Sequence, residues 1–213
     1  MGRPRSIGGS TLERVGRIGT FGLGVVGAVV AGSVLYVLPA TLSLPRGCRP
    51  GLEDLTIEEA AVWLRRSGAA GWDLVEAARR LVGERMAYCR RNGLDSYRRA
   101  FRRGYGYCEQ SAFALAALLQ QLGYDARPVH CERNLFPDRD SPTGHAWVRV
   151  FYDGQMREID PKHQDLETGD FHFEPLDEAR EYSLAFRLVA RWGSAIANAY
   201  RYYRTGSDMD PGY

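Results

Sequence analysis

The stretch that decides the fold runs from Gly104 to Arg127 and reads GYGYCEQSAFALAALLQQLGYDAR. It opens with alternating glycine and tyrosine, a pattern that interrupts a preceding helix. From Cys108 to Leu122 the residues are mostly Ala, Leu and Gln, which favour a helix, and Gly123 supplies a C-terminal stop. The sequence therefore predicts a buried helix that begins at or next to Cys108.

A thiol at the start of a helix has a chemical use. The partial positive charge and free N–H groups of a helix N-terminus favour the thiolate, which is the nucleophilic form of cysteine. The same N–H groups can bind the oxyanion that forms when a thiolate attacks a carbonyl. Cys108 is therefore a candidate nucleophile, although a lone cysteine in an Ala/Leu-rich helix is usually a core residue. Such a nucleophile needs a base, and the base needs an orienting group.

Three segments after this helix are rich in β-branched and aromatic residues and predict strands: residues 126–132, 145–152 and 155–160. Asp153-Gly154 is typical of a two-residue hairpin loop between the last two segments. In the register that this loop sets, His145 and Asp160 lie on one face as diagonal neighbours, about 7–8 Å apart at the backbone. A loop one residue longer would turn one strand over. His145 is thus a candidate base and Asp160 its candidate partner.

Helices are expected on both sides of this region. Thr56 and Glu59 form a capping-box pattern. The expected helices run from Thr56 to about Arg66, from Asp73 to about Asn92, over residues 95–103, and over about residues 178–203. Helices first, then a helix that carries the thiol, then an antiparallel sheet indicate the α+β fold class.

The N-terminal segment indicates a membrane. No residue from Ile18 to Pro45 is charged, and a bilayer core of about 30 Å needs about 20 apolar residues in a helix. We expect a transmembrane signal-anchor helix over residues 18–44, with lipid as its partner. Arginines in residues 1–17 favour a cytoplasmic tail and place the following domain outside the cytoplasm. A cleaved signal peptide, whose apolar region is usually about 7–15 residues, and a buried core helix are the alternatives.

Two further segments have the composition of connecting chain. Residues 45–55 contain prolines and glycines and are expected to form a linker. Residues 205–213 are expected to be a disordered tail.

Charge and cysteine spacing exclude several classes of protein. A net charge of +2 is too small to indicate nucleic acid as a partner. The four cysteines contain no C-x-x-C pair, which argues against a zinc ribbon or a thioredoxin site. We expect no metal and no cofactor. A disulfide among Cys48, Cys89 and Cys131 and the oligomeric state stay open.

Three motifs in order resemble those of the transglutaminase-like superfamily: Gly104 to Arg127, Gly144 to Val148 (GHAWV), and Ile159 to Pro161 (IDP). The resemblance covers about residues 95–163. It implies a papain-like core, the nucleophile helix packed on a small antiparallel sheet with flanking helices, within a domain over residues 56–204.

The resemblance also implies roles for single residues. Cys108 would be the nucleophile, His145 the general base and acid, and Asp160 the orienter of the imidazole. The second oxyanion donor would come from a residue before the nucleophile, with Tyr105 and Tyr107 as candidates. Trp147, next to the histidine on the same face, is a candidate for substrate binding.

The implied chemistry is acyl transfer from an amide of a peptide or protein. The thiolate attacks the carbonyl, the imidazole protonates the leaving amine, and water or a second amine resolves the thioester. This describes a cysteine peptidase or amidase, or a transglutaminase. The alternatives are a non-catalytic, membrane-tethered peptide-binding module of the same fold and a leader-peptide-processing cysteine peptidase.

Overall fold

The computed structural model describes residues 27–137, 139–162 and 171–208. Its helices are one over residues 27–42, then α2 (Ile57–Arg66), α3 (Gly71–Arg85), α4 (Tyr97–Arg103), α5 (Cys108–Gln121) and α6 (Leu184–Thr205). Its strands are β1 (Ala87–Tyr88), β2 (Tyr105–Gly106), β3 (Asp125–Leu135), β4 (Thr143–Tyr152), β5 (Gln155–Ile159), β6 (Glu174–Pro175) and β7 (Arg180–Glu181). The predicted α+β class is confirmed.

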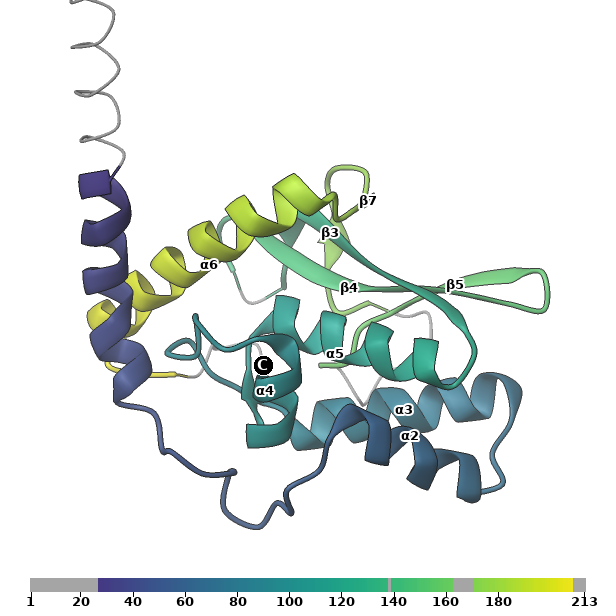
Figure 1. The fold of residues 1–213 in the computed structure, drawn as a ribbon. Coiled ribbons are helices and arrows are strands. Elements are labelled where there is room, and N and C mark those ends of the chain that lie inside the picture. Colours follow the sequence, from purple (N-terminus) through teal and green to yellow (C-terminus); the bar gives the residue numbers. More distant parts are fainter. Residues whose placement is uncertain (1–26, 138, 163–170, 209–213) are drawn as a thin grey trace, which may run out of the picture.

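The helix α5 lies at the centre of the fold. One side of it packs on β3 and β4, and the other packs on α2, α3 and α4 (Figure 1). Leu115, Leu118 and Leu119 are fully buried there, and each buried leucine contributes about 1.5–3 kcal/mol relative to an exposed one. Burial on both sides explains why this helix is apolar nearly all round, and it fixes the helix start against the sheet.

The main sheet is antiparallel in the order β5-β4-β3-β6, with β7 also pairing with β3. Asp153 and Gly154 both have positive φ, 50° and 69°, as a type I′ hairpin turn requires. Tyr152 pairs with Gln155 and Val148 with Ile159. The register predicted from the Asp-Gly pair is therefore confirmed.

The predicted helix ends are partly correct. Thr56 and Glu59 form the capping box that opens α2. The next helix does not run from Asp73 to Asn92, as predicted, but ends at Arg85. After it the chain becomes extended, and β1 pairs in parallel with β2, directly before Cys108. This long-range pairing overrides the helical pattern, because its backbone hydrogen bonds replace those of further helical turns.

The C-terminal helix also begins later than predicted. The sequence favoured a helix from about residue 178, but β7 pairs with β3 at Val129 and His130, and α6 begins after Ser183, whose side chain caps it. Residues 205–208, predicted to be disordered, are held in place, because Arg91 binds the carboxylate of Asp208. Residues 209–213 lie outside the described chain.

The helix over residues 27–42 packs on α6 near its own C-terminal end. Val37 is buried with Ala195 and Ala199, and the rings of Tyr36 and Tyr203 meet edge to face (Figure 1). The predicted anchor, residues 18–44, lies only partly within this helix, since residues 18–26 are outside the described chain. Over the ranges that the structure covers, no helix combines the length and the apolar character needed to cross a membrane.

The expected linker is attached to the domain along its length. Arg49 N–H donates to the Arg103 carbonyl at 2.8 Å, and the guanidinium of Arg85 donates to the Glu53 carbonyl at 2.7 Å. Residues 45–55 therefore run along the surface of α4 and the end of α3.

Candidate active site

Cys108 is the first residue of α5, after Tyr107 as N-cap. Its side chain is half-buried. The N–H groups of the first helical turn lack partners within the helix, so they surround this thiol with partial positive charge. The position agrees with the sequence prediction, and its cause is the β1–β2 pairing that holds the preceding residues extended.

His145 and Asp160 come from β4 and from the residue after β5. The Nε2 atom of His145 lies 2.7 Å from Oδ2 of Asp160, and both side chains are at least 98% buried. The thiol of Cys108 is a hydrogen-bond partner of the same ring. Since Nε2 faces the carboxylate, Nδ1 is the nitrogen left for the thiol. The structure therefore brings the three predicted residues into one chain of contacts.

The environment of His145 favours its protonated form. Burial lowers the pKa of the imidazole, but the charge and hydrogen bond of Asp160, with a contribution from Cys108, outweigh burial and raise that pKa to about 9. The ring is thus an imidazolium at neutral pH. A cation beside a thiol favours the anionic sulfur that a nucleophilic cysteine needs.

Asp160 is itself held by a second contact. Its Oδ1 accepts the backbone N–H of Lys162 at 2.9 Å, and the Lys162 ammonium donates to the carbonyl of Met86. Met86 directly precedes β1 and contacts Gly106 of β2. Lys162, the only lysine of the chain, therefore links Asp160, just after β5, to Met86 in the segment before β1.

Aromatic rings enclose the histidine. Phe136 and Phe173 meet His145 edge to face, with ring centroids 5.4 Å and 4.7 Å away, and Trp147 stacks at 6.0 Å. This enclosure keeps water away from the His145–Asp160 contact, which strengthens it. Trp147 is completely buried and donates from Nε1 to Glu158 at 3.1 Å. The ring of Trp147 therefore supports the histidine from inside the core, and its role in substrate binding stays a prediction.

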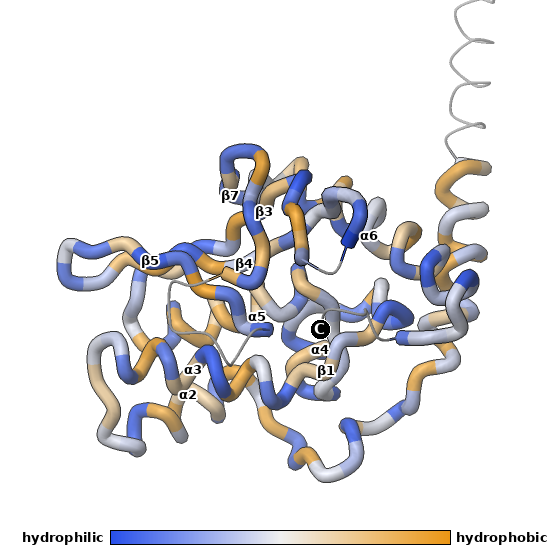
Figure 2. Tube along the Cα trace, turned by 180° about the vertical axis from the view of Figure 1, so that it is seen from behind, coloured by the Kyte–Doolittle hydropathy of each residue, from blue (hydrophilic) through white to orange (hydrophobic). Residues whose placement is uncertain are grey.

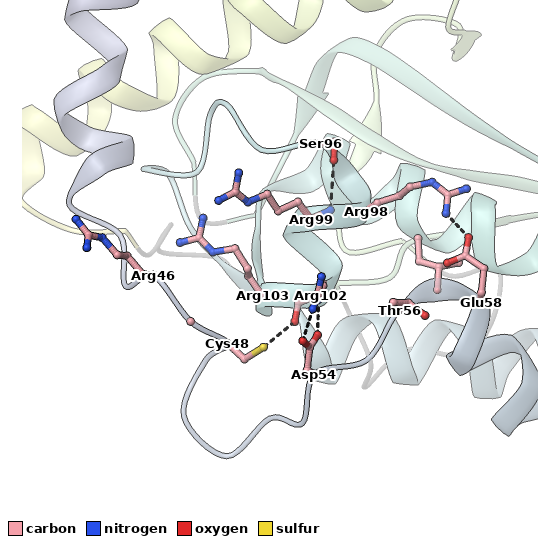
Figure 3. Close-up of a pocket in the computed structure, with 12 residues that line it drawn as sticks. Arg46, Cys48, Asp54, Thr56, Glu58, Ser96, Arg98, Arg99, Arg102 and Arg103 are labelled. Atoms are coloured by element: carbon pink, nitrogen blue, oxygen red, sulfur yellow. Dashed lines mark hydrogen bonds and ion pairs between the residues drawn. The ribbon is translucent and has the colours of Figure 1, made fainter.

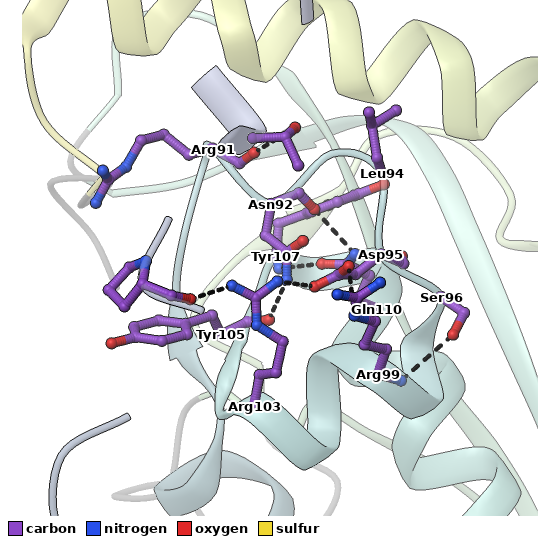
Figure 4. Close-up of polar contacts among 12 residues, drawn as sticks. Arg91, Asn92, Leu94, Asp95, Ser96, Arg99, Arg103, Tyr105, Tyr107 and Gln110 are labelled. Carbon is purple, nitrogen blue, oxygen red and sulfur yellow. Dashed lines mark hydrogen bonds and ion pairs between the residues drawn. The ribbon is translucent and has the colours of Figure 1, made fainter. Parts of the chain in front are cut away.

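A buried amide fixes the start of α5 (Figure 4). Gln110 accepts the Tyr107 N–H through Oε1 at 3.1 Å. It also donates from Nε2 to the carbonyls of Asn92 and Asp95, at 2.9 Å and 2.8 Å. Gln110 thus joins the loop after β1 to the helix that carries the candidate nucleophile.

The two candidates for the second oxyanion donor differ in what they already bind. The N–H of Tyr107 is engaged by Gln110, and the Tyr107 ring is buried. Tyr105 is half-buried, and its carbonyl accepts from Asn92 at 2.6 Å. The oxyanion roles of both residues stay predictions.

All four cysteines are free thiols. Cys131 is buried opposite His145 in the β3–β4 register. Burial, with the nearby Asp208 carboxylate, raises the pKa of Cys89 to about 12, so that thiol is inert at neutral pH. Cys48 is half-buried like Cys108 but donates to the carbonyl of Arg102.

A cavity of about 630 Å³ lies between α4 and the segment before α2 (Figure 3). It is lined by many arginines, but Arg102 pairs with Asp54, Arg98 with Glu58, and Arg103 with Asp95. These pairs join α4 to its neighbours, so the arginine-rich stretch is structural in large part.

Metal ligands do not gather in the described ranges: no three His, Cys, Asp or Glu side chains there are arranged to hold an ion.

The site combines a thiol at a helix start with a buried His–Asp pair on the adjoining sheet of an α+β domain. Residues 65–161 match the sequence model of the transglutaminase-like superfamily. None of the curated proteins compared with the chain matches it.

Solved structures also resemble the chain. Two are of the periplasmic domain of TgpA from Pseudomonas aeruginosa, one bound to ethylmercury (24% identity, 58% of this chain and 48% of that one, TM-score 0.37) and one without it (26%, 59% and 46%, 0.39). A third is a candidate cysteine protease from Cytophaga hutchinsonii (16%, 60% and 42%, 0.41). The chain spans less than half the length of each.

Sequence reasoning missed the supports of the site. Gln110 was visible as a polar residue at the third position of the predicted helix, where capping residues act. Lys162 was visible as a lone lysine among arginines. Phe136 and Phe173 gave no signal, because nothing local to them indicates that they meet His145.

Proposed function

We propose that the protein is a cysteine-dependent acyl-transfer enzyme that acts on amide bonds of peptides or proteins. The observation that best supports this proposal is the 2.7 Å contact between the buried side chains of His145 and Asp160. The His145 ring is also hydrogen-bonded to the thiol of Cys108. A triad works through this sequence of contacts, from nucleophile to base to orienting group.

In the proposed reaction the sulfur of Cys108 attacks the amide carbonyl carbon. The N–H of Cys108 binds the oxyanion. His145 then gives its proton to the leaving amine as the C–N bond breaks, which leaves a thioester. Attack by water, activated by the now neutral His145, releases an acid and restores the thiol. Attack by another amine instead yields a new amide, and this would make the enzyme a transglutaminase.

The matched test is alkylation of the two half-buried thiols by iodoacetamide, followed by mass spectrometry. We expect Cys108 to react much faster than Cys48 at neutral pH, and His145→Ala to slow Cys108 without changing Cys48. Equal rates for the two thiols, or a Cys108 rate that does not respond to His145→Ala, would contradict the proposal.

Substrate capture tests the acyl-transfer step itself. In a Cys108→Ala variant the binding site is kept while the thioester cannot form, so amide-bearing substrate should be retained and identifiable by mass spectrometry. The wild-type chain, which would convert and release it, is the control. Retention by both proteins without conversion would instead indicate the non-catalytic peptide-binding module. Capture and cleavage of a leader segment would identify the leader-peptide peptidase.

The proposed location is the extracytoplasmic side of a membrane, with residues 18–44 as anchor. The support is the uncharged stretch from Ile18 to Pro45 and the arginines before it. A reporter enzyme fused after Tyr213 that is active only outside the cytoplasm is the expected result; activity in the cytoplasm would reverse the orientation.

A further inference from the structure

The helix α6 turns large apolar side chains to the outside, the reverse of the usual arrangement in a surface helix of a soluble domain. A surface helix normally turns apolar residues to the core and charged ones to water. Here the exposed side chains include large apolar and aromatic ones: Leu188, Val189, Trp192, Ile196, Tyr200 and Tyr203, which are 61%, 72%, 39%, 37%, 52% and 45% exposed. From residue 185 to residue 203, no exposed position of α6 is charged.

Three of the four arginines of α6 face the domain instead, and only Arg204, near its C-terminal end, is exposed. Arg187 lies over the ring of Phe113 at 4.3 Å, and Arg191 donates to the carbonyl of Leu94 at 2.6 Å. The other inner contacts come from Phe186, which stacks on His130 at 4.2 Å, and from small residues such as Ala195 and Ala199. The domain therefore uses the polar face of α6 for its own contacts and leaves the apolar face outside, which marks that face as an interaction site.

The apolar face continues onto a second helix. The helix over residues 27–42 meets α6 where Tyr203 donates to the carbonyl of Tyr36 at 2.9 Å, and the two helices diverge from there (Figure 1). Its own exposed side chains include Val29, Val30 and Leu35, and Figure 2 shows hydrophobic stretches along it. Apart from Arg204, which lies beside the ring of Tyr200 near the C-terminal end of α6, the exposed positions of the two helices carry no charge.

We propose that the outer face of α6 rests in a phospholipid bilayer at its water interface, next to the helix over residues 27–42. Two observations favour lipid over another protein. The face is continuous with a stretch that carries no charge from Ile18 to Pro45. It also carries Trp192, Tyr200 and Tyr203, and amphipathic rings of this kind concentrate where hydrocarbon meets water.

Bilayer contact would fix the orientation of the whole domain. α6 runs along one side of the domain, and the N-terminal end of the helix over residues 27–42 points toward that same side (Figure 1). A single anchor helix leaves a domain free to rotate, whereas a second apolar face in the same bilayer does not. This inference does not depend on the chemistry of Cys108.

The chain offers a matched pair of tryptophans for the test. Trp192 lies on the proposed lipid face. Trp63 is more exposed, at 59%, and belongs to α2, which lies on the opposite side of the domain from α6 (Figure 1). The full chain would be placed in vesicles of phosphatidylcholine brominated on its acyl chains, because bromine quenches indole fluorescence on contact. We expect wild type and Trp63→Phe to be quenched and Trp192→Phe to lose most of the quenching.

Two outcomes of this experiment would contradict lipid contact. Quenching that is the same in Trp192→Phe and in wild type would exclude lipid contact at this face. An unquenched Trp192 in a dimer that Ile196→Glu dissociates would identify a second copy as the occupant instead. Because Arg204 is the only exposed charged residue of the described helix, quenching should be present in vesicles of phosphatidylcholine alone; a strict need for phosphatidylglycerol would contradict the proposal.

Discussion

Trp147 and Glu158 stand in the same diagonal relationship as His145 and Asp160. The indole Nε1 of Trp147 donates to Glu158 at 3.1 Å. On both strands this contact lies two residues from the 2.7 Å contact of His145 with Asp160. The residue directly opposite Glu158 is Arg149, which binds the same carboxylate at 2.6 Å. The Trp147 contact therefore repeats the geometry of the His–Asp pair and holds β4 and β5 in the offset that the pair needs.

This relationship predicts different effects for two substitutions of Trp147. Trp147→Phe removes the N–H and part of the ring volume, while Glu158 keeps Arg149, so the free energy of unfolding should fall by about 1–2 kcal/mol. Trp147→Ala opens a cavity next to His145 and should cost about 3–5 kcal/mol. Urea unfolding followed by circular dichroism measures both. Equal losses in the two variants would mean that the hydrogen bond, and not the packing, stabilises this part of the sheet.

Asp160→Asn tests the electrostatic role of the carboxylate. Asp160 raises the pKa of His145 to about 9 from an ordinary 6.5. Its contribution to stability is thus fully present below about pH 6.5 and is lost as pH rises through about 9. In Asp160→Asn the burial that lowers that pKa is opposed only by the contribution of Cys108, so the pKa of His145 should fall, and amide hydrolysis should fall by up to about 10⁴-fold. The pH dependence of Cys108 alkylation reports the change, and an alkaline limb that stays near pH 9 would contradict it.

Local signals allowed the centre of the site to be predicted from sequence. The Asp153-Gly154 turn sets the register of β4 and β5 through its backbone angles alone, and the Ala/Leu-rich run after Cys108 defines α5. His145 and Asp160 follow from that register by counting. Each of these inferences uses residues that are close together in the chain.

Long-range contacts explain what the sequence did not predict. The early end of α3 depends on the pairing of β1 with β2. The burial of Trp147 depends on Phe171 and Phe173, which approach it from a distant segment. The reversed polarity of α6 likewise depends on the domain residues that Arg187 and Arg191 contact, Phe113 and Leu94, and helical periodicity alone does not indicate these contacts.

Gln110→Glu should loosen the start of α5. A carboxylate can still accept the Tyr107 N–H, but it cannot donate to the carbonyls of Asn92 and Asp95. Loss of two donors at a buried site should lower the free energy of unfolding by about 2–4 kcal/mol and slow alkylation of Cys108. Gln121→Glu, at the exposed end of the same helix, is the control and should change neither. Unchanged alkylation in a destabilised Gln110→Glu would limit Gln110 to a structural role.

Replacing the buried Glu109 by glutamine should stabilise the fold at high pH. Burial raises the pKa of this carboxyl to about 7 from 4.5, although Arg191 and Arg187 of α6 oppose the shift. An acid with a raised pKa destabilises the fold as pH rises from about 4.5 through 7, because only the unfolded chain ionises freely. Glu109→Gln should therefore be more stable than wild type by about 1–3 kcal/mol at pH 8 and equal to it near pH 4. Thermal unfolding at the two pH values measures this, and a destabilised variant at pH 8 would mean that the arginine contacts outweigh burial.

Lys162 should show a conflict between stability and activity. Burial lowers the pKa of its ammonium to about 8 from 10.5, so the charge destabilises the fold below about pH 8 and the penalty disappears as pH rises toward 10.5. Lys162→Met removes that charge and should raise the free energy of unfolding by about 1–2 kcal/mol at pH 7, with no gain near pH 10. The same change breaks the tie from Asp160 to Met86, so alkylation of Cys108 should slow. A variant that is more stable and equally reactive would show that the backbone N–H of residue 162 alone positions Asp160, and that the lysine side chain has no part in the site.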